Sequence, residues 1–275
     1  MHRLVLLPSR LVPLYIVRAV LLCVALSQRA EAQSPAAPQR SAHDADVVVR
    51  ADRLYFEGQP RASLALLEGS AGAEPGAYGV LWRAARAAAV VGIMTPAHQN
   101  DFYARAITLA DKALSIDPEG IDALYWRTVA KGRMALRKGP RTSARLAQEV
   151  FDDAHRILEL DPDHGGAYNA LGQLNYQVMK LSRVERFLAR LIVGNVALRR
   201  TSWENAETYL REAVRLWPDM VVFRVDLGRL YLKRGRRELA RASLEEALAL
   251  PNRHPPDRAF KDEARGLLKD LAARH

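Results

Sequence analysis

The sequence contains a single cysteine, Cys23, among its 275 residues. A chain with one cysteine forms no internal disulfide and no cysteine-based zinc site. Alternating runs of valine, isoleucine and threonine are also scarce, while alanine, leucine and arginine dominate. Because strands favour the former pattern and helices the latter composition, we expect an all-α protein whose stability comes from packing.

Patterns typical of catalysis and metal binding are missing as well. None of the seven histidines stands four residues from another, as zinc-binding helices require. The stretch "DPDHGG" (161–166) is interpreted as a turn with a helix cap rather than as a set of metal ligands. "EGSAG" (68–72) lacks the first glycine of a nucleophile elbow, and "KGPRTS" (138–143) lacks the order of a phosphate-binding loop. We therefore expect no catalytic residue, no metal and no cofactor.

The first 32 residues resemble an export signal. Basic residues open the segment, a short apolar stretch, "AVLLCVALS" (19–27), follows, and Ala30-Glu31-Ala32 fits the small-x-small cleavage pattern. Cleavage after Ala32 would leave 243 residues and, by removing four arginines and Glu31, lower the net charge from +10 to +7. We expect a periplasmic or secreted protein. An uncleaved anchor stays open, although Arg18 splits the apolar run well below the roughly 20 residues that span a bilayer.

The rest of the chain is predicted to form a flexible leader, residues 33–44, and one helical repeat domain, residues 45–275. Within this domain a ladder of small and apolar residues recurs, spaced by four, three and about five positions. It appears as Ala106, Ala110, Ala113 and Pro118, as Ala206, Leu210, Ala213 and Pro218, and as Ala240, Leu244, Ala247 and Pro251. The last two copies are 34 residues apart. This pattern resembles the tetratricopeptide repeat, in which helix pairs stack and share one elongated core.

Small residues in such a ladder let the two helices of a pair approach each other closely. We predict that Gly228 faces Ala240, with Tyr231 and Leu244 filling the space beside them. Gly235 is predicted to allow the turn between the helices, because glycine tolerates a positive φ.

The prolines that end the units lie at 75, 118, 162, 218 and 251, with spacings of 43, 44, 56 and 33 residues. Most units therefore carry an insertion between their helices, the longest being 181–200. A capping box in "TSWE" (201–204) is predicted to begin the helix after it. The expected helices cover 45–57, 60–69, 77–93, 99–117, 120–137, 142–160, 164–199 with a break near Gly194, 202–217, 219–234, 237–250 and 256–272. They form an α-solenoid of about five degenerate helix pairs plus a C-terminal capping helix.

Three segments resemble the regulator of microtubule dynamics family: "LWRAARA" (81–87), "LGQLNYQVMKLSRVER" (171–186) and "ALALPNRHPPD" (247–257). The resemblance spans roughly residues 45–272, and Arg183 departs from it by standing where tryptophan is expected. It implies a tetratricopeptide-like fold without catalytic activity. Eukaryotic members are linked to microtubules and organelle contact sites, but the export signal indicates a bacterial relative. We therefore carry over the fold and an adaptor role only.

Basic residues crowd three places in the repeats, the last being the turn with Arg234, Arg236, Arg237 and Arg241. One group, in the third unit, is Arg133, Arg137, Lys138, Arg141 and Arg145. On the long insertion, Arg183, Arg186 and Arg190 share a helix face by their spacing. A basic amphipathic helix can lie on an anionic membrane surface, and a repeat helix with a solvated basic face is the alternative. Nucleic acid is not an expected partner of an exported protein, despite the net charge of +10.

The first helices of stacked repeats line the concave side of a solenoid. The residues expected there are Asn169, Gln173, Tyr176, Gln177, Val225, Arg229 and Lys233, although plain solvent exposure would account for them equally well. The tryptophans at 82, 126, 203 and 217 are interpreted as packing residues in preference to ligand-stacking ones.

The sequence thus predicts a non-enzymatic exported adaptor that binds a protein or peptide in its concave groove. The alternative is an envelope-surface protein that binds lipid or another apolar ligand. A polar lining with Arg229 and Lys233 would favour the peptide, and a continuous apolar channel reaching 181–200 would favour the lipid.

Overall fold

The computed structural model describes residues 37–70, 77–182, 184–186 and 201–273. These residues form eleven α-helices and one 3-10 helix and contain no strand, so the all-α prediction is confirmed. Contacts divide the chain into residues 1–43 and 44–275. The features below lie in the second unit, apart from the first residues of α2. The predicted signal, 1–32, lies outside the described residues.

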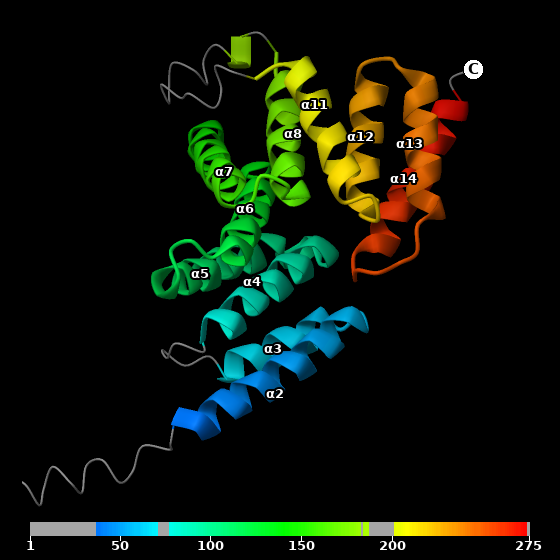
Figure 1. Ribbon diagram of the computed structural model, residues 1–275. Coiled ribbons are helices and arrows are strands. Elements are labelled where there is room, and N and C mark those ends of the chain that lie inside the picture. The colour runs from blue at the N-terminus through cyan, green and yellow to red at the C-terminus, as the bar shows by residue number, and fades with distance from the viewer. Residues whose placement is uncertain (1–36, 71–76, 183, 187–200, 274–275) are drawn as a thin grey trace, which may run out of the picture. The chain divides into compact units, whose positions relative to one another are not determined.

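The helices follow one another along the chain as pairs (Figure 1). The pairs are α2 (Ala37–Phe56) with α3 (Pro60–Ser70), α4 (Ala77–Met94) with α5 (Gln99–Ile116), α6 (Ile121–Ala135) with α7 (Pro140–Leu160), α8 (Gly165–Lys180) with α11 (Trp203–Leu216), and α12 (Val221–Lys233) with α13 (Arg237–Ala249). The 3-10 helix η2 (Pro96–His98) joins α4 to α5, and α14 (Asp257–Ala272) follows the last pair. Five helix pairs with a terminal helix are the predicted architecture.

The repeat ladder forms the interior of these pairs. Its alanines and leucines are all fully buried, at 0% exposure: Ala106, Ala110, Ala113, Ala206, Leu210, Ala213, Ala240, Leu244 and Ala247. Small buried side chains at these positions bring the two helices of each pair into close contact.

Two glycines lie where paired helices come closest. A Cβ atom at Gly172 would lie 2.7 Å from Cγ of Leu210, and one at Gly228 would lie 2.8 Å from Cγ of Leu244. Both leucines are fully buried, so neither has room to move. The prediction that Gly228 faces Ala240 is therefore wrong by one helical turn, because Leu244 occupies that place.

Local signals in the turns correspond closely to the sequence. Gly235 has a φ of 72°, as predicted for the α12–α13 turn. The helix after the long insertion is capped by Ser202, whose side chain accepts a hydrogen bond from the backbone N–H of Asn205 at 2.9 Å. The predicted capping box in 201–204 is thus displaced by one residue. At the N-terminal end, α2 begins at Ala37, eight residues before the predicted start, within the segment expected to be a flexible leader.

The helix before the insertion is shorter than predicted, because α8 ends at Lys180 rather than running on to 199. Its end agrees with the predicted start of the insertion at 181. Ser182 and Glu185 form a reciprocal capping box: the Ser182 N–H donates to Oε2 of Glu185 (2.7 Å), and the Glu185 N–H donates to Oγ of Ser182 (3.2 Å). Arg186 donates to the carbonyl oxygens of Met179 and Leu181, which satisfies the C-terminal end of α8. The segment "LSRVER", part of the family resemblance, is therefore a helix-stop and helix-start signal.

Ion pairs join equivalent positions of consecutive repeats. Arg86 pairs with Asp52, Arg253 with Asp219 and Arg229 with Glu263, and each pair is separated by 34 residues. This separation equals the standard repeat period of 34 residues. Two of the pairs join neighbouring first helices, and the pair of Arg253 with Asp219 joins the segments that precede α14 and α12.

The turn before α8 contains a histidine cap. Oδ1 of Asp161 accepts from the N–H of Asp163 at 3.2 Å, and Nδ1 of His164 accepts from the N–H of Ala167 at 3.1 Å. The interpretation of "DPDHGG" as a turn with a helix cap is confirmed. Burial lowers the pKa of His164 below its ordinary value, so the ring is neutral and free to accept this bond at neutral pH.

Of the described helices, α4 is long and apolar enough to cross a membrane by length and composition. Its apolar window is 67% buried within the fold, and Ala84 and Ala88 are fully buried. Both features are typical of a core helix in a helical repeat.

Replacing Gly228 by alanine should lower the free energy of unfolding by about 1–3 kcal/mol, because the new methyl group overlaps Leu244. Gly266→Ala in α14 is the matched control, since no atom lies within 4 Å of a Cβ there. That control should stabilise the helix by up to about 1 kcal/mol. Urea unfolding followed by circular dichroism measures both variants. A Gly228→Ala protein as stable as the wild type would refute the close approach.

His164 should make stability fall in mild acid. In the unfolded chain the ring protonates near its ordinary pKa of about 6.5, whereas the folded state resists protonation, so stability is lost as the pH falls below about 6.5. His164→Asn keeps a capping side chain that does not titrate. Its free energy of unfolding should decline less than that of the wild type between about pH 7 and about pH 5.5. Equal declines would exclude His164 as the titrating group.

Candidate functional site

A pocket of about 570 Å³ lies among the first helices of four repeats. Residues of α4, α6, α8 and α12 build most of its wall, and the end of α2, α7 and the start of α14 contribute the rest. We call it the aromatic pocket after its lining. Nine aromatic side chains line it: Tyr55, Phe56, Trp82, Tyr125, Trp126, Tyr176, Trp217, Phe223 and Phe260.

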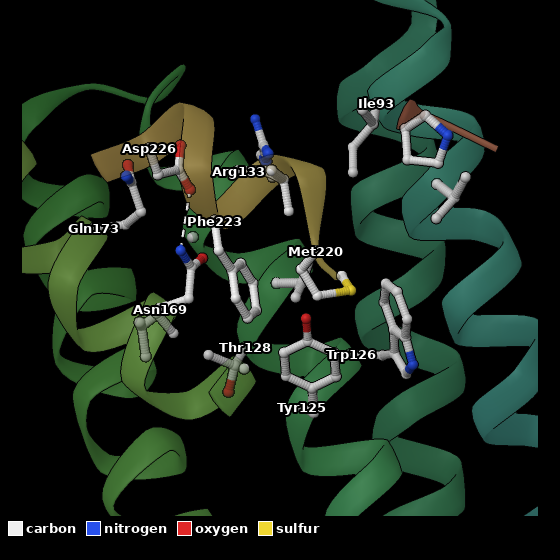
Figure 2. Close-up of a pocket in the computed structure, with 18 of the residues that line it drawn as sticks. Ile93, Tyr125, Trp126, Thr128, Arg133, Asn169, Gln173, Met220, Phe223 and Asp226 are labelled. Carbon is white, nitrogen blue, oxygen red and sulfur yellow. Dashed lines mark hydrogen bonds between the residues drawn. The ribbon is translucent and has the colours of Figure 1, made fainter. Parts of the chain in front are cut away.

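The aromatic lining alters the interpretation of the tryptophans. Three of the four line the pocket, and only Trp203 does not; it packs edge-on against Tyr176, with ring centroids 6.1 Å apart. Figure 2 shows Phe223 and Trp126 on either side of Met220, with Tyr125 below them, and all four residues line the pocket. The tryptophans are far apart in the sequence, and no sequence pattern indicated that three of them line the same pocket.

The rings at the back of the pocket hold one another in place. Trp217 stacks on Phe223 with centroids 6.0 Å apart and meets Tyr125 edge-on at 6.1 Å. The two glycines after His164 make room for them, because a Cβ at Gly165 would lie 2.8 Å from Cγ of Trp217 and one at Gly166 would overlap Tyr125. The "DPDHGG" turn therefore both caps α8 and seats part of the aromatic wall.

Helix α8 adds a row of amide side chains to this wall, formed by Asn169, Gln173 and Gln177. Nδ2 of Asn169 donates to Oδ2 of Asp226 at 3.2 Å (Figure 2). Nε2 of Gln177 lies 3.5 Å from Oε1 of Gln173, at the limit of a hydrogen bond. Nε2 of Gln173 is buried and has no hydrogen-bond partner among the described residues. The pocket thus contains a polar donor that the described fold does not satisfy.

Tyr176 also lines the pocket, but most of its side chain is buried in a core cluster with Leu210 and Leu230. Burial raises the pKa of its phenol, so the hydroxyl stays protonated. Val225, expected on the concave wall, is fully buried in the core, and that expectation is wrong.

The charge of Arg229 is taken up within the fold. It lines the pocket, donates through Nε to Oε1 of Glu263 at 2.6 Å, and also pairs with Asp226. Asp226 is 3% exposed, and burial raises the pKa of its carboxyl against the opposing field of Arg229. Lys233, the other predicted cation of this helix, is exposed and does not line the pocket.

Two further arginines line the pocket without having been singled out as site residues. Arg86 is 7% exposed, pairs with Asp52 and lies 3.9 Å from the ring centroid of Tyr55. Arg133, near the end of α6, lies 5.7 Å from the ring centroid of Phe260 and has no ion pair with any described residue. The sequence placed Arg133 only within a basic cluster, because a sequence shows charges but not their partners.

The predicted cationic face of the insertion is only partly described. Arg183 and Arg190 lie outside the described residues, and Arg186 is engaged in capping the end of α8. The structure therefore places one of these three arginines, in a local structural contact.

Three titratable groups of the pocket are engaged in structural bonds, whereas Asp122 also lines it and has its pKa raised by burial. His164 caps α8, Asp226 is bound by Asn169 and Arg229, and Asp257 accepts the N–H groups of Arg253 and His254. Within the described ranges, no group of three or more histidine, cysteine, aspartate or glutamate side chains could hold a metal ion. The other side chains that line the pocket include aromatic rings, the amides of α8 and the guanidinium of Arg133. Such groups can bind a ligand by packing and hydrogen bonding.

Comparison with known proteins agrees with the fold. The profile described as regulator of microtubule dynamics protein 1-3 matches residues 47–272. Regulator of microtubule dynamics protein 1 of Mus musculus is 23% identical over 230 residues, which is 82% of this chain and 74% of that protein. The Caenorhabditis elegans protein of the same name is 22% identical over 158 residues, covering 58% of this chain and 69% of that one.

Among solved structures, a thermophilic TPR protein of Thermus thermophilus superposes with a TM-score of 0.58 and 17% identity, over 82% of this chain and 99% of that one. Likeness at this identity shows the tetratricopeptide fold alone. Since the family profile extends from α2 to α14, the chain belongs to the regulator of microtubule dynamics protein 1-3 family.

Proposed function

We propose that this protein is a non-enzymatic scaffold that binds an extended segment of another protein in the aromatic pocket. The observation that carries the proposal is the row of amides on α8 beside an aromatic wall. Aromatic rings take apolar side chains, and amide groups pair with the N–H and C=O groups of a peptide backbone. Together they match the two chemical components of an extended peptide.

The size of the pocket suits a short segment. An engineered cavity of ~150 Å³ admits one benzene molecule. A volume of about 570 Å³ therefore has room for roughly three ring-sized groups, or one or two side chains with their backbone. This is also within the range of typical ligand pockets, ~300–1,000 Å³.

The unsatisfied donor of Gln173 favours a polar ligand. A buried donor without a partner costs about 1–3 kcal/mol, and a rotation of the Gln173 side chain toward the pocket would let a peptide carbonyl oxygen remove that cost. A hydrocarbon chain in the same place would leave the donor unsatisfied.

An apolar ligand such as a lipid acyl chain is the second candidate, and the nine aromatic side chains favour it. The polar lining expected from Arg229 and Lys233 does not decide between the two, because Arg229 is neutralised and Lys233 lies outside the pocket. The other criterion, a channel reaching 181–200, falls largely outside the described residues. The amide row is what favours the peptide.

Peptide binding is tested with a phage-displayed random peptide library on the full chain. In a Trp203→Phe variant the remaining tryptophans all line the pocket, so binding of a selected peptide should change their emission. Gln173→Ala should weaken that peptide about 2- to 10-fold, the effect of one hydrogen bond of ~0.5–1.5 kcal/mol. Gln59→Ala, an exposed glutamine in the α2–α3 turn, is the control. A co-purifying phospholipid in stoichiometric amount, with no peptide enriched, would contradict the proposal.

The proposal includes export to the periplasm or the outside of the cell. Expressed in a Gram-negative host, the chain should yield a periplasmic protein that begins at Gln33, as measured by intact mass. Ala32→Leu removes the small residue before the cleavage site and should leave the precursor uncut. A wild-type protein that retains residues 1–32 would show that the segment is an anchor or an uncleaved leader.

A further inference from the structure

Four cations and no acid occupy the segment "RMALRKGPR" (133–141), at the end of α6 and the start of α7. Arg133 lines the aromatic pocket, while Arg137, Lys138 and Arg141 are exposed at the turn that follows. No described carboxylate forms an ion pair with any of the four. We call these four residues the basic rim.

Two other arginines of the pocket wall are neutralised within the fold, whereas Lys180, at the end of α8, lines the pocket without an ion pair to any described residue. Arg86 pairs with Asp52, and Arg229 with Asp226 and Glu263. Lys131 of α6 is buried and lies 3.0 Å from Glu149 and 3.3 Å from Asp153, both on α7. The basic rim is therefore the largest group of cations near the pocket without a described ion pair, and Lys180 adds a single further cation on α8.

Asp226, a buried carboxylate that lines the pocket, does not form an ion pair with Arg133. Both oxygens of Asp226 are engaged, Oδ2 by Asn169 and Oδ1 by Arg229. Arg133 lines the pocket from α6 (Figure 2), and its field opposes the burial that raises the pKa of Asp226.

An apolar surface joins the basic rim to the aromatic pocket. Leu136 is 55% exposed and lines the pocket, between Arg133 and Arg137 in the sequence. The guanidinium of Arg133 also lies 5.7 Å from the ring centroid of Phe260, which lines the pocket from α14. A ligand that fits both must combine an apolar side chain with negative charge.

We infer, on the basis of the proposed function, that the bound segment is an acidic peptide. It places an apolar or aromatic side chain against the rings of the aromatic pocket and a carboxylate on the guanidinium of Arg133. Further acidic residues of the peptide face the exposed cations of the basic rim. A guanidinium binds a carboxylate through two parallel hydrogen bonds, and the neighbouring cations increase the rate of encounter.

The test uses two labelled synthetic peptides and fluorescence anisotropy on the full chain. One peptide has a central Phe-Leu pair flanked on each side by two glutamates, and in the other the glutamates are glutamines. The glutamate peptide should bind at least about 10-fold more tightly, and salt should weaken it more than its counterpart.

Charge reversal locates the effect. Arg137→Glu with Arg141→Glu should remove the preference for the glutamate peptide, and Arg133→Lys should reduce it by removing the guanidinium fork. Arg211→Glu with Lys269→Glu changes the net charge by the same amount at exposed positions outside the pocket, and should leave the preference intact. Circular dichroism checks that each variant folds.

The outcomes separate this inference from the proposed function. Equal affinity for the two peptides, or library selection of neutral peptides, would overturn the acidic partner and leave peptide binding standing. A control pair that abolishes the preference as fully as the rim variants would show a general charge effect and overturn the site. No peptide binding, together with binding to vesicles of phosphatidylcholine and phosphatidylserine, would overturn both.

Discussion

The close approach of paired helices is the constraint on which the rest of the structure depends. Buried alanines together with Gly172 and Gly228 let one helix seat a leucine of its partner against bare backbone. Each pair is thereby fixed in register, and stacking then repeats that register along the chain. The first helix of each pair must present a consistent face to the next, and the aromatic pocket is lined by these faces. Packing inside the pairs thus positions side chains that are far apart in sequence.

Ion pairs 34 residues apart show the same repetition in electrostatic form. Arg229 and Glu263 meet because α12 and α14 occupy equivalent places, and Arg86 and Asp52 meet for the same reason between α4 and α2. Such pairs neutralise cations along the pocket wall and help to fix neighbouring repeats in register. An arginine with an acidic partner 34 residues away therefore stabilises the stacking of repeats. An arginine without such a partner does not have this role.

The sequence predicted the helix pairs well because the ladder and the turn residues are local signals. The cap at His164 and the turn at Gly235 are of this kind. The rotation of one helix about its axis relative to its partner depends on contacts between distant residues. We therefore predicted that Gly228 faces Ala240, whereas Leu244 lies against it. The amides of α8 were found from the repeat register, but the unpaired state of Arg133 was not, because it depends on which carboxylates lie near. Long apolar periodicity also concealed the Ser182–Glu185 box that ends α8.

An unpaired surface cation is not evidence of a partner by itself, because water solvates it at little cost. Arg133, Arg137 and Arg141, however, follow one another at intervals of four residues around the end of α6. Arg133 lies in α6, Arg137 in the turn and Arg141 in α7, so their positions gather like charges at one end of this helix pair, where they repel weakly through solvent. The free protein thus carries a small electrostatic cost beside its pocket. A negatively charged ligand would turn the same arrangement into a favourable one, and a neutral ligand would leave the cost in place.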